Sequence, residues 1–250
     1  MTKPRVYIIG IGAGNPKHLT VQAIEAMREA DAVMAMDKGD KKADLLQLRK
    51  FFLEKYAPDT PLITVTDPER DRNPADYKAE VERWHQARAD KLKAAMPSGT
   101  VAFLVWGDPN LYDSTLRIIE RMGISDIEVI PGITSIQALT ATFGLVLNKI
   151  GGPITITTGR QLENSSAPDP TENTVVMLDG HAAWQAHVTD NTYIWWGAYL
   201  GTENEVLREG FVKDIGDELA QLKADLRQKL GWIMDIYLLR EVDRADVLMP

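Results

Sequence analysis

Three apolar runs in the first half of the chain each end in a glycine-bearing turn. Residues 6–11, 101–106 and 127–130 lead into the turns GAGNP, GDPNLY and PGITS, respectively. Short apolar runs that alternate with helical patterns predict parallel strands buried on both faces. Because open α/β sheets bind ligands at the carboxyl ends of their strands, the three turns predict one ligand-binding edge.

The rest of the chain first extends this pattern and then changes it. Residues 32–36 and 61–65 predict two further strands of the first sheet. Residues 158–174 are rich in Ser, Pro, Asn and Asp and predict a surface loop. After Gly132 we expect a helix over 134–143, strands over 154–157, 175–178, 193–196 and 233–239, and a helix with Leu219, Leu222, Leu226 and Leu230 on one face. The sequence therefore predicts two α/β domains, residues 1–130 and 131–250.

Composition narrows the possible partners. The chain has 36 acidic and 28 basic residues and a formal charge of −8, which disfavours binding to nucleic acid or to a membrane surface. It has no cysteine, so disulfides, thiolate catalysis and cysteine-ligated zinc are excluded. Its four histidines are scattered, and no run reaches the roughly 20 apolar residues of a membrane span. We expect a cytoplasmic protein without a metal site.

The first turn resembles a dinucleotide-binding loop but departs from it. Gly10, Gly12 and Gly14 form G-x-G-x-G, so the third glycine comes one residue earlier than in G-x-G-x-x-G. Pro16 follows and has no N–H to offer a phosphate. Asp37 ends the second predicted strand, where a ribose-binding carboxylate would lie. A nicotinamide-linked dehydrogenase stays open as an alternative, as does a tight turn that only needs small residues.

Taken together, GIGAGNPKHLT, WGDPNLY and VIPGITS resemble the tetrapyrrole methyltransferases, the class III S-adenosylmethionine enzymes of cobalamin and sirohaem synthesis. The resemblance spans nearly the whole chain. It implies two α/β domains, S-adenosylmethionine in the cleft between them, and a homodimer. One departure is Asn15, since much of the family has Asp there. The residues implied to contact the cofactor are Ala13, Asp108, Leu111, Thr134, Ser135, Met177 and Ala198. The loop with Gly12, Gly14 and Pro16 would line the tetrapyrrole.

Longer stretches resemble a deacetylating branch of that family. They are MDKGDKKADL, FLVWGDPNLYDSTLRI, ITTGR, VVMLDG, WGAYLGT and LGWIMDIYLLR. This resemblance implies methylation of precorrin-5 at carbon 1 with release of acetate, giving precorrin-6A and S-adenosylhomocysteine. Methylation at another corrin-ring position is the alternative within the family.

Loss of the acetyl group requires a base or an oriented water. Asp37, at a strand end that we expect beside the glycine loop, is our first candidate, although Asp37-Lys38-Gly39 can equally form a turn. Tyr112 and Asp113 come next, although Asp113 can equally cap a helix over residues 114–122.

The many carboxylate arms of a precorrin require local arginines on this acidic chain. Arg160, Arg70 and Arg72 are the candidates, and we expect Arg160 and the Arg70–Arg72 loop to form a partial lid. Arg83 and Arg88 are further candidates, but a solvated helix face is the simpler interpretation of those two.

Overall fold

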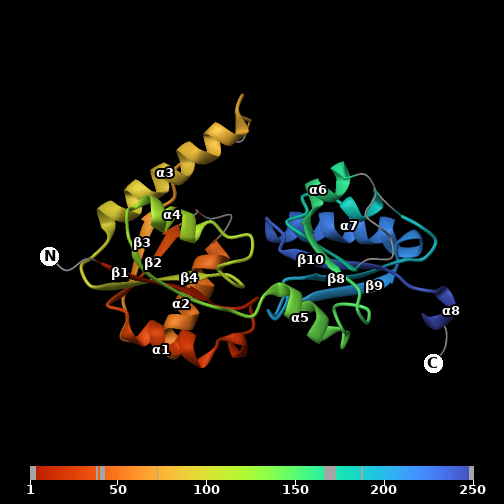
Figure 1. Cartoon of the computed structure of the whole chain (residues 1–250), viewed down its shortest axis with the longest axis horizontal. Coiled ribbons are helices and arrows are strands. Elements are labelled where there is room, and N and C mark those ends of the chain that lie inside the picture. Colours follow the sequence, from red (N-terminus) through yellow and green to blue (C-terminus); the bar gives the residue numbers. More distant parts are fainter. Residues whose placement is uncertain are drawn as a thin grey trace. The chain divides into compact units, whose positions relative to one another are not determined.

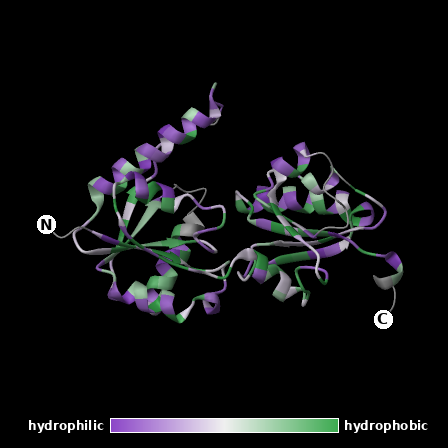
Figure 2. Cartoon of the chain, in the orientation of Figure 1, coloured by the Kyte–Doolittle hydropathy of each residue, from purple (hydrophilic) through white to green (hydrophobic). Residues whose placement is uncertain are grey.

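A computed structural model describes residues 4–37, 39, 43–71, 73–165, 173–186 and 188–247. The chain divides into two compact units, Met1–Thr134 and Ser135–Pro250, and each is described by itself (Figure 1). The strands of both units are mainly apolar, and outward helices such as α3 are mainly hydrophilic (Figure 2). Each strand predicted from the sequence is present, with its ends shifted by at most two residues.

The first unit is built on a parallel sheet of order β3-β2-β4-β1-β5. Parallel pairing of apolar strands agrees with the expectation from the sequence. Because β1 lies between β4 and β5, the turns that follow these three strands leave neighbouring positions of one sheet edge. The strands are β1 Arg5–Gly10, β2 Ala32–Asp37, β3 Leu62–Thr66, β4 Thr100–Val105 and β5 Asp126–Ile130.

Helices cover both faces of this sheet. Alternate residues of β1 point to opposite faces, so Ile9 packs with Met27 and Phe52, whereas Ile8 packs in a second core cluster. Figure 1 shows α1 and α2 on one face and α3 and α4 on the other. These helices are α1 Val21–Glu29, α2 Ala43–Tyr56, α3 Tyr77–Ala95 and α4 Thr115–Arg121.

The second unit has a mixed sheet of order β6-β7-β10-β8-β9. Only β6 and β7 pair in parallel, and the other neighbours are antiparallel. The strands are β6 Ile154–Thr158, β7 Asn173–Met177, β8 Thr192–Ala198, β9 Val206–Phe211 and β10 Asp235–Glu241. Strand β9 was not expected from the sequence. The surface loop predicted over 158–174 is wrong in part, because Gly159–Asn164 form helix α6.

Two helices flank the second sheet. Helix α7, Val212–Leu230, buries Leu219 and packs Leu222, Leu226 and Leu230 against the cluster that contains Trp196 and Tyr237, as its leucine spacing predicts. Helix α5, Ser135–Thr142, lies on the other face, where a side chain on Gly197 would meet Leu139. The described residues of this unit also form the 3-10 helix η3 Ala183–Gln185 and the short helix α8 Arg244–Val247.

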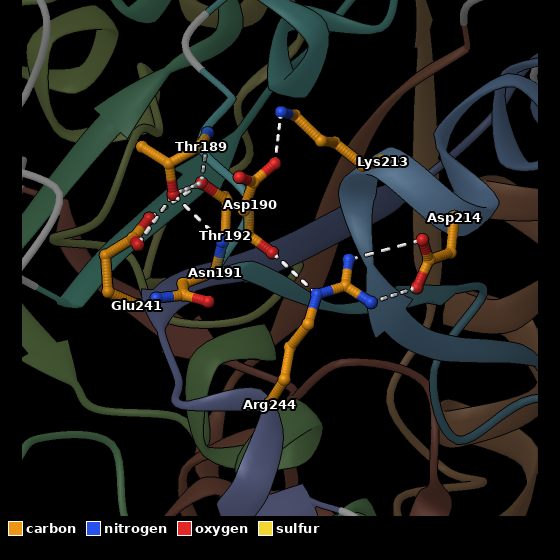
Figure 3. Close-up of polar contacts among 8 residues, drawn as sticks. All are labelled: Thr189, Asp190, Asn191, Thr192, Lys213, Asp214, Glu241 and Arg244. Atoms are coloured by element: carbon orange, nitrogen blue, oxygen red, sulfur yellow. Dashed lines mark hydrogen bonds and ion pairs between the residues drawn. The ribbon is translucent and has the colours of Figure 1, made fainter.

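A polar network fastens one end of this sheet to α7 and α8 (Figure 3). Glu241, at the end of β10, accepts hydrogen bonds of 2.7 Å from the hydroxyls of Thr189 and Thr192. Arg244 donates to the carboxylate of Asp214 at 2.9 and 3.2 Å and to the carbonyl of Asp190 at 3.0 Å. Because Met177 ends β7 at the opposite end of the sheet, this network is a structural anchor remote from that residue.

Candidate functional site

The turns that follow β1 and β4 are joined by backbone hydrogen bonds. The N–H of Ile11, one residue beyond the last paired residue of β1, donates to the carbonyl of Val105 at 2.9 Å. The backbones of Gly12 and Gly107 then exchange two hydrogen bonds, with N···O distances of 2.9 and 3.3 Å. The two loops therefore leave the sheet as one rigid piece.

The turn after β5 packs directly against these two joined turns, and the contact is between backbone atoms without side chains. A Cβ added at Gly132 would lie 2.2 Å from the carbonyl oxygen of Gly107 and 2.8 Å from the carbonyl carbon of Gly10. A Cβ added at Gly10 would lie 2.5 Å from the nitrogen of Gly132. Any side chain at Gly10 or Gly132 would clash with main-chain atoms, which explains glycine at these two positions. In the second turn, Gly107 has a φ of +68°, which favours glycine.

Asp108 ties the second turn to the third. One of its carboxylate oxygens accepts a hydrogen bond from the N–H of Gly132 at 2.9 Å, and the other accepts from the N–H of Asn110 at 2.8 Å. Its carbonyl accepts from the N–H of Leu111 at 3.2 Å. The backbone of Thr134 lies beside Gly107. Of the predicted cofactor residues, the structure thus brings Asp108, Leu111 and Thr134 together at one sheet edge.

The glycine loop after β1 is rigid and compact. Ala13 is buried, and Gly12 and Gly14 adopt φ values of +78° and +130°, which favour glycine. Asn15 caps a 3-10 turn, η1 Pro16–His18, by accepting from the N–H of Lys17, and α1 begins only at Val21. A dinucleotide pyrophosphate requires a helix N-terminus beside the glycines, so this geometry argues against a nicotinamide site.

The proposed bases follow β2 and β4: Asp37 ends β2, and Tyr112 and Asp113 lie between β4 and α4. Strand β4 lies between β2 and β1 in the sheet. The expectation that Asp37 lies directly beside the glycine loop is therefore wrong. One carboxylate oxygen of Asp37 accepts from the N–H of Gly39 at 2.9 Å, so the turn interpretation holds. Tyr112 is 44% exposed. Asp113 accepts from the N–H of Thr115, the first residue of α4, at 2.6 Å, whereas the N-cap residue is Ser114.

Two of the candidate arginines are engaged by carboxylates of their own chain. Arg83 donates two hydrogen bonds of 2.6 Å to Glu80 and lowers the pKa of that carboxyl to about 2. Arg88 pairs with Asp67 and stacks on Trp84, 3.4 Å from the ring centroid. Because Arg88 is only 5% exposed, the interpretation as a solvated face is wrong for it.

The other arginine candidates differ from these two. The guanidinium of Arg70 lies 5.2 Å from the ring centroids of both Tyr77 and Trp84. Arg160, at the start of α6, is exposed. Arg72 lies outside the described residues. The predicted lid is not tested by these positions and stays a prediction.

Sequence reasoning missed a cation near Asp113. Arg49 of α2 donates from Nε to the carbonyl of Leu104 at 2.9 Å, beyond the point where β2 stops pairing with β4. Burial lowers the pKa of Arg49, and the nearby Asp113 opposes this shift. An arginine among the many charged residues of a helix gives no signal of such burial.

In the second unit, two predicted cofactor residues flank one strand. In the register of the sheet, Met177 of β7 and Gly197 of β8 both pair with Ile236 of β10, and Ala198 pairs with Asp235. Met177 is half-buried, whereas Ala198 is fully buried in the core under α7. A ligand can therefore reach Ala198 only through its backbone.

Left-handed backbone occurs next to three of the predicted cofactor residues. Among the described residues, three non-glycine residues have a positive φ: Tyr112 (51°), Leu178 (53°) and Tyr199 (51°). They directly follow Leu111, Met177 and Ala198, respectively, which are all predicted cofactor contacts. Such strained residues cluster at ligand sites, so this coincidence supports the assignment independently of any resemblance.

Residues 5–216 match the model of the family Tetrapyrrole (Corrin/Porphyrin) Methylases. The chain belongs to this family. Membership confirms the resemblance and the two-unit α/β fold predicted from the sequence. It also places the chain among methyltransferases and removes the nicotinamide-linked dehydrogenase as an alternative.

Individual relatives refine this placement among the tetrapyrrole methylases. The chain is 43% identical over 249 residues to a precorrin-6A synthase [deacetylating] of Sinorhizobium sp, and the match covers 95% of each protein. It is 51% identical to the crystal structure of a putative cobalamin synthesis related protein (CobF) from Corynebacterium diphtheriae, with a TM-score of 0.84 over 97% of this chain and 100% of that one.

A more distant tetrapyrrole methylase shares the fold. The uroporphyrin-III C-methyl transferase of Thermus thermophilus, solved with S-adenosylhomocysteine, superposes with a TM-score of 0.59 at 21% identity over 96% of this chain and 99% of that one. In the part of the chain that the structure describes, no cluster of side chains suits a metal ion, and no helix is both long and apolar enough to cross a membrane.

Proposed function

We propose that this chain transfers a methyl group from S-adenosylmethionine to carbon 1 of precorrin-5 and releases acetate, which yields precorrin-6A for cobalamin synthesis. The observation that carries the proposal is the 43% identity to a precorrin-6A synthase [deacetylating] along nearly the whole of both chains. The joined turns after β1, β4 and β5 are consistent with it, because they form a preorganised edge without a phosphate-binding helix.

The cofactor supplies an activated methyl group on a sulfonium and leaves as a neutral thioether. An electron-rich ring carbon of the substrate provides the electron pair of the new bond, so the protein contributes mainly positioning. We assign contacts with the cofactor to Ala13, Asp108, Leu111 and Thr134 in the first unit and to Ser135, Met177 and Ala198 in the second. Since both carboxylate oxygens of Asp108 accept backbone hydrogen bonds, its main role is to hold the turn in shape.

Removal of the acetyl group is a separate step: water attacks the acetyl carbonyl, the bond between that carbonyl carbon and the ring breaks, acetate leaves, and the electron pair of the broken bond stays on the ring carbon. Asp37 is our candidate for orienting this water. Among the described residues, its carboxylate accepts from the N–H of Gly39, and a carboxylate has about four acceptor positions, so it can also accept from a water. Tyr112, partly exposed on the turn after Asp108, is the candidate for donating a hydrogen bond to the carbonyl oxygen.

The substrate is a large ring with carboxylate arms. The loop with Gly12, Gly14 and Pro16 has no long side chain between residues 12 and 16, and we assign it to the face of the ring. Arg160, exposed at the start of α6, and Arg70 are the candidates for the arms. Arg83 and Arg88 pair with Glu80 and Asp67. A net charge of −8 disfavours a nucleic-acid or membrane partner. We also propose a cytoplasmic location and a homodimer.

The test is turnover of enzymatically generated precorrin-5 with S-adenosylmethionine, followed by product mass and free acetate. A gain of one methyl group with one acetate released is the expected result. A gain of methyl without acetate would mean that another ring position is methylated. Asp37→Asn should slow acetate release more than it weakens binding of S-adenosylhomocysteine, and Arg160→Ala should weaken tetrapyrrole binding only.

A further inference from the structure

Leu178 combines two unfavourable features at one position. It is a bulky residue in left-handed backbone, with φ of 53°, and its apolar side chain is 65% exposed. A conformation of this kind persists only where the surrounding structure holds it. Leu178 directly follows Met177 at the carboxyl end of β7, so both features occur where we expect a ligand.

Asp179, the next residue, holds the backbone of Leu178 in this conformation. The carboxylate of Asp179 accepts hydrogen bonds from the N–H of His181 at 2.9 Å, the N–H of Ala183 at 3.0 Å and the hydroxyl of Tyr237 at 2.9 Å. Its carbonyl accepts from the ammonium of Lys223 at 2.8 Å. Four hydrogen bonds therefore fix both ends of a buried residue, and they determine the direction of the chain at Leu178.

The same network extends to the strands beside Met177. The ammonium of Lys223 lies 2.8 Å from the carboxylate of Asp235 at the start of β10, and that carboxylate accepts from the indole N–H of Trp196 at 2.9 Å. A Cβ on Gly159 would lie 2.5 Å from the carboxylate of Asp179, so α6 also packs directly against it. Segments far apart in the chain thus converge behind one short turn.

We infer that Leu178 binds the flat, apolar face of an unsaturated ring, and that Asp179 is the positioning residue that presents it. This inference rests on the proposed function, which supplies two such rings, the adenine of the cofactor and the tetrapyrrole. Contact with a ring face removes the exposed leucine from water, which gives a reason for holding it outward against its backbone preference.

The experiment measures the affinity of the full chain for S-adenosylhomocysteine and for the tetrapyrrole by calorimetry. Leu178→Ala should weaken binding of one of them about tenfold, because three side-chain carbons are lost from the contact. Ile150→Ala is the matched control, since Ile150 is a fully exposed aliphatic residue elsewhere in the same unit, and affinity should not change. Leu178→Gly should weaken binding in the same way and raise the melting temperature, since glycine tolerates positive φ.

The positioning role of Asp179 is tested through its partner. Tyr237→Phe keeps the aromatic ring and removes one of the four hydrogen bonds, and it should weaken binding of the same ligand about threefold. Asp179→Asn should weaken binding further if the chain folds.

A loss confined to S-adenosylhomocysteine would identify adenine as the ring, and a loss confined to the tetrapyrrole would identify the macrocycle. If the wild type binds both ligands and Leu178→Ala binds them with unchanged affinity, the inference is overturned and the proposed function is not. Failure of the wild type to bind either ligand would overturn both.

Discussion

Replacing Gly132 by alanine tests whether the three turns must meet through bare backbone. The backbone of Gly132 lies outside the left-handed region, so alanine is acceptable there on conformational grounds. The added methyl carbon would nevertheless lie 2.2 Å from the oxygen of Gly107 and within 2.9 Å of two backbone atoms of Gly10. Only movement of a turn or a strand end relieves these contacts, because no flexible side chain is available to yield.

Overpacking of a rigid site destabilises a protein by about 1–3 kcal/mol, and contacts with backbone belong at the upper end of that range. We therefore expect Gly132→Ala to lower the free energy of unfolding by about 3 kcal/mol. A loss of that size corresponds to a fall of roughly 10 °C in the melting temperature of a unit of this size. Binding of S-adenosylhomocysteine should weaken as well, since Asp108 accepts from the N–H of Gly132.

Urea unfolding followed by circular dichroism measures the change, with Gly180→Ala as the control. Nothing lies within 4 Å of a Cβ at Gly180, and its φ is not positive, so that variant should stay within about 0.5 kcal/mol of the wild type. The double variant Gly10→Ala/Gly132→Ala should lose less than the sum of the single losses, because both methyl groups open the same contact. A loss below about 1 kcal/mol for Gly132→Ala would refute the reasoning.

Three further changes test other parts of the chain. Asp108→Ala leaves the N–H groups of Gly132 and Asn110 without their acceptor and should lower stability by about 2 kcal/mol in urea unfolding. Lys223→Met leaves Asp179 and Asp235 buried without a cation and should lower stability by about 3–5 kcal/mol at pH 8. Because burial raises the pKa of Asp235, protonation favours the folded chain, so this loss should shrink as the pH falls to 5, and an equal loss at both pH values would contradict this account. Glu80→Gln should lower stability at pH 6 but not at pH 2, because the lowered pKa of Glu80 makes its ion pair stabilising above its unfolded pKa and lost as the pH falls to about 2.

Periodicity was sufficient for most strands and insufficient for β9 and α6. In β9, the exposed Arg208 and Glu209 interrupt the apolar pattern, because an edge strand of a mixed sheet needs little burial. In α6, composition suggested a loop, yet Thr158 accepts from the N–H of Gln161, and this pair fits the start of a capping box. The local signal for a helix was present and the loop-like composition concealed it.

The candidate site also has one part that the sequence predicted and one part that it did not. Glycines at three strand ends predicted a common edge, because parallel topology brings those ends together whatever the loops do. The network of Asp179, Lys223 and Asp235 left no trace in the sequence, since its members come from separate segments and resemble ordinary surface charges. Only the packing of α7 on the sheet makes them neighbours.

The position of β10 in its sheet has a consequence for folding of the chain during translation. It pairs with both β7 and β8, yet it is translated after both of them. Strand β7 ends at Met177 and β8 at Ala198, so 64 (241 − 177) and 43 (241 − 198) further residues must be made before β10 is complete. At about 5–20 residues per second this takes roughly 3–13 s for β7 and roughly 2–9 s for β8, and during this time both strands lack their β10 partner. Aggregation during expression should therefore originate in the second unit, at the edges that β10 later covers.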